Sequence, residues 1–225
     1  MLNDLSQFTA AVLSSRMDAA WSYDRNTGRY RDEKGKFLSK AAIDALVDGR
    51  INKLGTMLKR FTNMLIDGNI TLDIWQSSVR EAIKAAHIQA AIIGNGGKSQ
   101  MGNADYGRIG QKLRQEYSYL QAFASDLLGQ RISRPMALAR IGLYASSVRA
   151  SYWEGVSIRN EKEGLSLMRR ILDPQAQHCD DCRNYAARGL VPIGSLPLPG
   201  QRCACRARCK CRVEYKRQQF PSIMV

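Results

Sequence analysis

The chain has 225 residues and a mass of 25.2 kDa, 44% of its residues are hydrophobic, and its formal net charge is +14. This length allows one or two compact domains, and the composition is that of a globular protein. No apolar run approaches the ~18 residues that cross a bilayer, so we expect no membrane partner.

The net charge indicates the kind of partner, and the N-terminus indicates the cellular compartment. The excess of Lys and Arg is typical of a protein that meets a polyanion, nucleic acid first, although a basic protein that docks on acidic proteins has the same composition. The N-terminus has an early Asp4 and no basic start, which is not typical of a secretory signal. We therefore expect a reducing cytoplasm, where cysteines hold metal more often than they form disulfides.

The first predicted unit spans residues 1–38. Apolar residues at helical spacing predict an amphipathic helix within residues 1–20. A basic segment with two turn signals follows, and it predicts a loop or a small hairpin. Its candidate phosphate contacts are Arg29, Arg31 and Lys36, and its candidate stacking side chains are Tyr30 and Phe37. The alternative, which we favour, is a solvated turn whose two aromatic side chains pack into the body.

The second unit, residues 39–160, is predicted to hold four helices. Apolar residues recur along each at steps of three and four, and Ser39 and Gly68 are the start and stop signals of the first. The expected helices span residues 39–67, 71–93, 105–128 and 133–158, with a glycine-rich loop over 94–102. Because each apolar stripe covers one face, we expect a bundle or antiparallel hairpins.

We expect no enzymatic activity. The glycine-rich loop contains Gly97-Lys98-Ser99, but a phosphate-binding loop would need glycine where Ile92 stands and would follow a strand. His87 lies in the middle of a predicted helix and is expected to be a packed or surface histidine. Asp180 and Asp181 are the carboxylates of the cysteine-rich region, and neither lies in the H-x-E frame of zinc deaminases.

The last unit, residues 161–225, has a different composition. Residues 165–172 and 212–215 are compatible with strands, and cysteine motifs and a Gly/Pro-rich stretch lie between them. The predicted fold class is therefore mainly α, a helical bundle or hairpins followed by a small Cys-rich α+β module.

All six cysteines lie within residues 179–211, in the order C-x2-C, a long spacer, and C-x-C-x3-C-x-C. A C-x2-C pair turns both sulfurs toward one cation and a second pair completes a tetrahedron, which predicts a structural zinc ion. The candidate ligands are Cys179, Cys182, Cys205, Cys209 and Cys211. We expect the first two with two of the last three, or with His178 in place of one. A disulfide knot and an iron–sulfur cluster are the weaker alternatives.

Basic residues surround the later cysteines. Neighbouring Arg and Lys stabilise thiolates and offset the formal charge of about −2 of a four-thiolate zinc site. They also leave a basic surface, which makes them further candidate nucleic-acid contacts. These residues are Arg202, Arg206, Arg208, Lys210 and Arg212.

The order of these C-terminal motifs resembles the phage head morphogenesis family, the minor head proteins of the Mu type. The parts that carry the resemblance are Leu172-Asp173, Cys179-Asp180-Asp181-Cys182, the spacer over 189–199, Cys209-Lys210-Cys211 and Val213-Glu214-Tyr215. The upstream helices look similar too, with Trp75 after a Gly-Asn turn and Tyr152-Trp153 further on. The chain departs from the family at residues 199–202, where His-Pro is usual, and in its extra Cys203 and Cys205.

The resemblance implies a structural role in a tailed-phage virion. Such proteins are present in few copies at the portal vertex, contact the portal, other head or neck proteins or the packaged DNA, and help the head to assemble. We therefore expect the chain in the virion head or portal vertex, after assembly in the host cytoplasm. The other hypothesis is a zinc-module regulatory protein that binds nucleic acid, which the charge and the Arg-rich cysteine region also favour.

Overall fold

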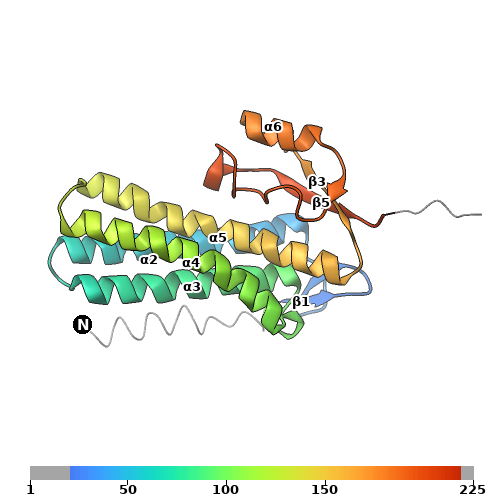
Figure 1. Cartoon of the computed structure of the whole chain (residues 1–225). Helices are drawn as coiled ribbons and strands as arrows, with labels where there is room; N and C mark the ends of the chain where they lie inside the picture. Colours follow the sequence, from blue (N-terminus) through green and yellow to red (C-terminus); the bar gives the residue numbers. More distant parts are fainter. Residues whose placement is uncertain (1–20, 219–225) are drawn as a thin grey trace, which may run out of the picture.

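The structure, a computed structural model, describes residues 21–218, and its body is a bundle of four long helices (Figure 1). They are α2 (Lys40–Ile66), α3 (Leu72–Asn95), α4 (Asn103–Leu128) and α5 (Arg134–Lys162). A hairpin precedes the bundle, and a module with a three-stranded sheet follows it. The predicted class, mainly α with a small Cys-rich module, is confirmed. The predicted helix within residues 1–20 lies outside the described residues.

The helices begin where the sequence offers caps. The Ser39 side chain accepts a hydrogen bond from the N–H of Ala42 and so satisfies a donor that the first turn of α2 leaves free. Thr71 does the same for the N–H of Ile74 in α3. Pro135 stands in the first turn of α5, where its missing N–H has no intrahelical partner to lose.

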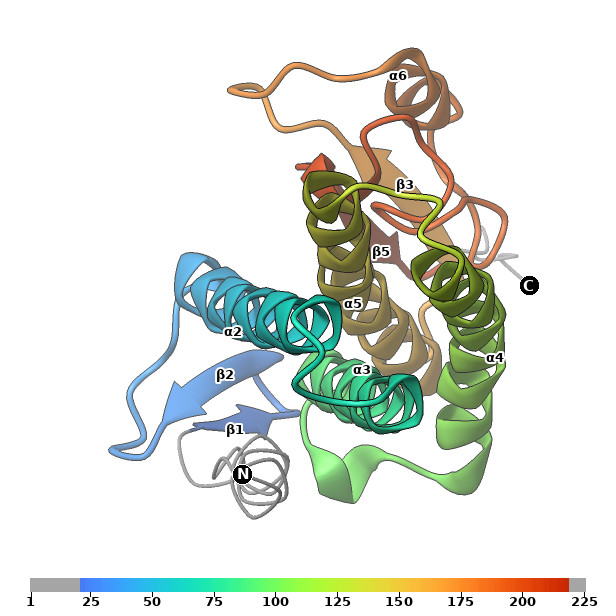
Figure 2. The same cartoon turned by 90° about the vertical axis from the view of Figure 1, so that its left-hand side faces the viewer.

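One apolar core joins the bundle, the hairpin and the module. Helix α5 packs against the other three helices, as the end-on view in Figure 2 shows. Trp75 of α3 is fully buried, and its ring meets Phe123 of α4 edge-on with 5.6 Å between centroids. Met168 and Val213 of the module belong to the same core. Because burial of this shared apolar surface stabilises both parts, the module is fixed on the bundle.

The end of α3 differs from the expected loop. The sequence places the start of the glycine-rich loop at Gly94, but the helix continues through Asn95 and ends at Gly96 in the left-handed conformation, with φ of 87°. Gly94 is buried against α5, where a Cβ would lie 2.0 Å from the carbonyl oxygen of Tyr152. Gly94 is therefore a residue of the contact between α3 and α5, and only glycine, which has no Cβ, fits there.

The basic segment after residue 20 forms a hairpin of β1 (Trp21–Asp24) and β2 (Arg29–Asp32). Tyr30 is buried and its hydroxyl donates a 2.6 Å hydrogen bond to the carbonyl of Ile93. Phe37 stays 42% exposed. One of the two aromatic side chains therefore packs into the body as expected, and the other remains at the surface.

The C-terminal module consists of β3 (Leu167–Ile171), α6 (Asp180–Ala187), β4 (Val191–Pro192), the short 3-10 helix η2 (Arg206–Arg208) and β5 (Arg212–Lys216). Its sheet is antiparallel, in the order β4-β3-β5, and β3 and β5 form where strands are expected. The module lies on one side of the bundle and the hairpin on the other (Figures 1 and 2). None of the helices within residues 21–218 combines the length and apolar character that crossing a membrane requires.

Candidate metal centre

Strand pairing in the module brings the distant cysteine motifs together. Ile171, at the end of β3, pairs with Arg212, at the start of β5. In an antiparallel pair these two strand ends lie at the same edge of the sheet. The segment with the Cys-x2-Cys motif, which follows β3, and the Cys-x-Cys motif, which precedes β5, therefore leave the sheet side by side.

All six cysteines are free and gather in one cluster of the module. Five of the six sulfurs form two triplets that share Cys182, Cys179–Cys182–Cys203 and Cys182–Cys209–Cys211, and within each triplet the sulfurs lie within 4.8 Å of one another. The sulfurs of Cys182 and Cys209 are 3.7 Å apart, beyond a disulfide bond. This distance is close to the ~3.8 Å edge of a tetrahedron with metal–sulfur bonds of about 2.3 Å. The cluster can hold a metal ion.

Backbone hydrogen bonds favour the thiolate form of two of these sulfurs. Burial raises the pKa of the Cys179 thiol, but hydrogen bonds from the backbone of Cys182 and the side chain and backbone of Cys205 lower it to about 6. Burial also raises the pKa of Cys209. Hydrogen bonds, first among them one with the backbone of Cys211, outweigh burial and lower the pKa of Cys209 below its usual value. Burial raises the pKa of Cys182, which lies in both triplets. Direct coordination to a cation would deprotonate it.

Arg170 of β3 is a cation that faces the cluster. It is 2% exposed, and its Nη1 lies 3.9 Å from the sulfur of Cys209. Its Nη2 donates to the carbonyl of Pro197, while its Nε has no hydrogen-bond partner among the described residues. A buried cation is costly without a negative partner. The negative charge of metal-bound thiolates would supply that partner, so the residues present fit a thiolate-bound metal.

His178 lies beside the second triplet in an orientation that leaves one ring nitrogen free for a metal. Its Nε2 is 2.7 Å from the carbonyl oxygen of Asp173. Because a carbonyl only accepts, Nε2 carries the proton and Nδ1 carries the lone pair. That Nδ1 is 3.5 Å from the sulfur of Cys211. A metal-bound histidine usually donates its other ring N–H to such an oxygen.

Helix α6 holds the loop that carries Cys203 and Cys205. The backbone N–H of Ala204 donates a 2.9 Å hydrogen bond to the Asp181 carboxylate. The hydroxyl of Tyr185 donates to the carbonyl of Arg202 at 2.6 Å. These two contacts lie on either side of Cys203, so they tie this part of the loop to α6 and hold Cys203 beside Cys179 and Cys182.

The structure brings all five predicted cysteine ligands into one cluster. Cys179, Cys182, Cys209 and Cys211 lie in the triplets, and Cys205 packs against them partly buried. Cys203 was left out of the predicted ligands, yet it is buried and belongs to the first triplet. The signal that could have found it is its C-x-C spacing with Cys205, which repeats that of Cys209 and Cys211.

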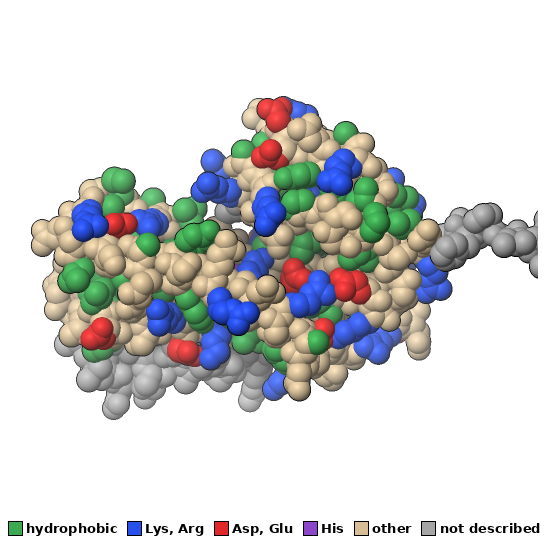
Figure 3. Space-filling view, viewed as in Figure 1, with side chains coloured by type: hydrophobic (Ala, Val, Ile, Leu, Met, Phe, Trp, Pro, Cys, Tyr) green, Lys and Arg blue, Asp and Glu red, His purple; other side chains and the backbone are tan. Residues whose placement is uncertain are grey.

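The predicted nucleic-acid contacts lie in two separate places. Those of the module are exposed: Arg202, Arg206, Arg208, Lys210 and Arg212. In the hairpin, Arg29 and Lys36 are exposed, but Arg31 pairs with Asp24 at 2.9 Å and covers the ring of Phe37 at 4.0 Å. On the face in Figure 3, Lys and Arg side chains are spread over both the module and the bundle, with Asp and Glu side chains among them. The hairpin and the module lie on different sides of the helices (Figures 1 and 2), so these two groups of residues are separate.

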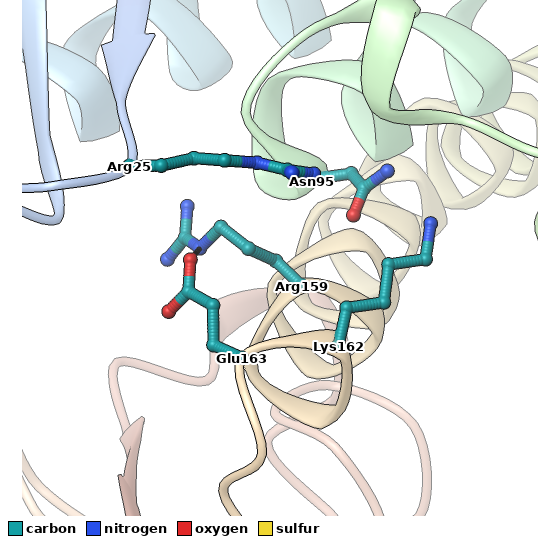
Figure 4. A pocket seen from close by; sticks show the side chains of 5 residues that line it. All are labelled: Arg25, Asn95, Arg159, Lys162 and Glu163. Carbon is teal, nitrogen blue, oxygen red and sulfur yellow. Dashed lines mark ion pairs between the residues drawn. The ribbon is translucent and has the colours of Figure 1, made fainter.

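A pocket of about 80 Å³ lies where the hairpin meets the ends of α3 and α5, and its lining is shown in Figure 4. It is lined by Arg25, Asn95, Arg159, Lys162 and Glu163. The Arg159 guanidinium donates to the hydroxyl of Tyr30 at 2.7 Å and to the carbonyl of Gly94 at 2.9 Å. Lys162 donates to the carbonyl of Gln100 at 2.7 Å. Arg159 therefore joins the hairpin, α3 and α5, and Lys162 joins α5 to the connection between α3 and α4, which are structural roles.

His87 is packed inside the bundle. Its Nδ1 lies 2.7 Å from the hydroxyl of Ser151, and its Nε2 lies 3.3 Å from that of Ser147. Burial, with Lys112 nearby, lowers the pKa of His87 to about 3. Burial lowers the pKa of Lys112 to about 8. A neutral histidine held between two hydroxyls is a satisfied core residue, so of the two alternatives from the sequence the packed one holds.

Comparisons of the chain with protein-family models, with curated proteins and with solved structures find no match. The cysteine cluster is therefore interpreted from its own geometry. Six sulfurs and an imidazole form a soft donor set, which selects borderline and soft cations over magnesium or calcium. Such a cluster can bind a metal and so join the segment that follows β3 to the segment that precedes β5.

Proposed function

We propose that this chain is a structural component of a tailed-phage virion, a minor head protein at the portal vertex that acts in head assembly or genome packaging. The observation that carries the proposal is the pairing of β3 with β5. It gathers the motifs that resemble the head morphogenesis family into one compact unit, seated on a helical bundle. The role proposed for this unit is mechanical, because its cysteine cluster joins segments distant in the sequence.

The proposed metal of this unit is zinc. Thiolates prefer zinc to hard cations, and zinc accepts the tetrahedral geometry that the sulfur spacing indicates. The 3.7 Å separation of the Cys182 and Cys209 sulfurs supports a shared cation. A small module whose sheet has a two-residue strand, β4, at one edge gains order from such a site, because metal binding and folding are coupled.

Contact with packaged DNA is proposed from charge. The formal net charge of +14 and the exposed arginines of η2 give a surface that neutralises phosphates without a groove-reading helix. Each neutralised phosphate releases counterions, so binding of this kind weakens steeply with salt for every sequence.

A second candidate function is a regulatory protein that binds nucleic acid through the metal module. The observation in its favour is that Arg206, Arg208 and Lys210 are exposed immediately beside buried cysteines. This candidate predicts a preferred sequence whose binding persists at moderate salt. Fluorescence anisotropy of the full chain with several duplexes, over a salt series, separates the candidates, since the virion role predicts the same salt slope for all duplexes.

The direct experiment on the virion role is mass spectrometry of particles from the phage that encodes the chain. Procapsids and mature heads are purified separately and washed, and the copy number is obtained relative to the portal protein. A few copies per particle in either form would support the proposal. Absence from both forms would overturn it, because a head-assembly protein must be present at one of these stages.

A further inference from the structure

We propose that the module binds two metal ions, and that the thiolate of Cys182 bridges them. This inference rests on the proposed metal-binding role of the module and adds the number of ions and the ligands of each. It accounts for six cysteines and a histidine in one cluster, a set larger than a single four-coordinate ion uses.

The arrangement of the sulfurs indicates two ions. If the sulfurs were arranged around a single ion, the neighbouring ones would form one set. Among the described residues, the sulfurs instead form two sets of three, and the only member in common is Cys182. Cys182 is fully buried between the two sets. A thiolate in this position, with more than one lone pair, can bind a cation on either side.

The first ion has Cys205 as its fourth ligand. The triplet of Cys179, Cys182 and Cys203 supplies three sulfurs. Cys205 is the one cysteine outside both triplets, and it packs against the cluster at its partly buried side. Cys203 and Cys205 share a C-x-C motif, as Cys209 and Cys211 do, so Cys205 is assigned as the fourth sulfur of this site.

The second ion has His178 as its fourth ligand. Its Nδ1 lies 3.5 Å from the sulfur of Cys211, close to the ~3.6 Å expected between nitrogen and sulfur ligands of one tetrahedral zinc. The Asp173 carbonyl accepts the proton of Nε2, so the lone pair of Nδ1 is directed to the cluster side. Together with Cys182 and Cys209, this gives three sulfurs and one nitrogen.

The charge of the two-ion cluster suits its surroundings. Six thiolates, a neutral imidazole and two divalent cations leave a net charge of about −2. The buried guanidinium of Arg170 lies 3.9 Å from Cys209 and offsets part of that charge. With a single four-coordinate ion, at least two of the six cysteines would lie in the cluster without a role as ligands.

The zinc content of the full chain is the first test, measured by native mass spectrometry and elemental analysis after growth with zinc and gel filtration. About two zinc ions per chain are expected. About one ion per chain would overturn the two-ion assignment and leave the single-metal module standing. No bound zinc would overturn both.

Cadmium-113 NMR of the cadmium-loaded chain tests the ligands and the bridge. Two resonances are expected, one typical of four sulfurs and one of three sulfurs with a nitrogen, and scalar coupling between the two through the bridging sulfur. Two uncoupled resonances would overturn the bridge. In His178→Gln the second resonance should be lost or shifted while the first stays, and His178→Cys should move it to the four-sulfur range.

Gln177→Ala is the matched control, because Gln177 is the exposed neighbour of His178. It should leave both resonances in place. A spectrum of His178→Gln that still shows the three-sulfur, one-nitrogen resonance would overturn the histidine assignment. The cadmium spectrum distinguishes ligation from a merely structural role, because a change of fold alone would disturb both resonances.

Discussion

Gly155 of α5 packs on the backbone of Ala91 in α3, and a Cβ on Gly155 would lie 2.1 Å from the Ala91 carbonyl oxygen. Backbone cannot yield as a flexible side chain does, so Gly155→Ala must push the two helices apart. We expect a loss of about 3 kcal/mol in the free energy of unfolding, measured by urea denaturation.

The matched control for this substitution is Gly107→Ala in α4. Gly107 is an exposed helical residue, and nothing lies within 4 Å of an added Cβ. Alanine has the higher helix propensity, so this variant should gain about 0.5–1 kcal/mol. Equal stability of the two variants would show that α3 and α5 are not in backbone contact.

Arg170 and Arg169 are neighbours on β3, and we expect their substitution to have different effects on zinc retention. Arg170 faces the sulfurs, whereas Arg169 pairs with Glu214 at the surface. Arg170→Met should weaken zinc retention by about 10–100-fold, because it removes the cation that offsets the thiolate charge. Arg169→Met should change retention little, since exposed ion pairs contribute weakly. Competition with a chromogenic chelator measures both, and equal retention would refute the role assigned to Arg170.

The buried His87 predicts acid sensitivity of the bundle. Its pKa is about 3 in the folded state, below the ordinary value of 6.5, so the unfolded chain binds more protons between these values. The free energy of unfolding should therefore fall as the pH is lowered from 6.5 toward 3, by up to about 1.4 kcal/mol per pH unit from this residue.

The variant His87→Gln keeps a hydrogen-bonding side chain beside Ser151 but removes the titration. Its stability should depend less steeply on pH than that of the unmodified chain over the same window. The contributions of carboxylates and of the metal site are common to both proteins and cancel in the comparison. Parallel pH profiles would contradict a buried, neutral His87.

Metal removal should act locally. The sulfurs join the segments around residues 172–185 and 200–211, whereas the apolar core of the bundle contains none of the six cysteines. After chelation, hydrogen exchange should become faster by at least about tenfold in α6 and in the loop before β5. Exchange in α3 and α5 should stay slow. Uniform acceleration over the whole chain would show that the bundle also depends on the metal.

The four long helices of the bundle could be predicted from local sequence, whereas α6 and β4 were not predicted. Ser39, Thr71 and Pro135 are start signals that act within one turn, so the helix starts they mark lie close to their predicted positions. Gly94 was misread because a glycine at a helix contact has the same local sequence as one in a loop. What distinguishes them is the distant Tyr152, which no local pattern contains.

The cysteine cluster was predicted only in part for a similar reason. The motif spacing indicated a metal site, because C-x2-C is a local device. The pairing of Ile171 with Arg212 and the place of Cys203 depend on the tertiary fold. The sequence suggested that the basic residues of the Arg-rich segment offset the charge of the thiolates. In the structure the buried cation beside the sulfurs is instead Arg170, which lies on β3.

The most direct test of the central claim, that the cysteines form a thiolate-bound metal centre, is thiol labelling of the native chain with and without a strong chelator. Bound metal predicts that all six cysteines resist alkylation until the chelator is added and that all six then react, with release of metal. Full alkylation without chelator, or cysteines that react only after reduction, would contradict the account, since the first outcome means no metal and the second means disulfides.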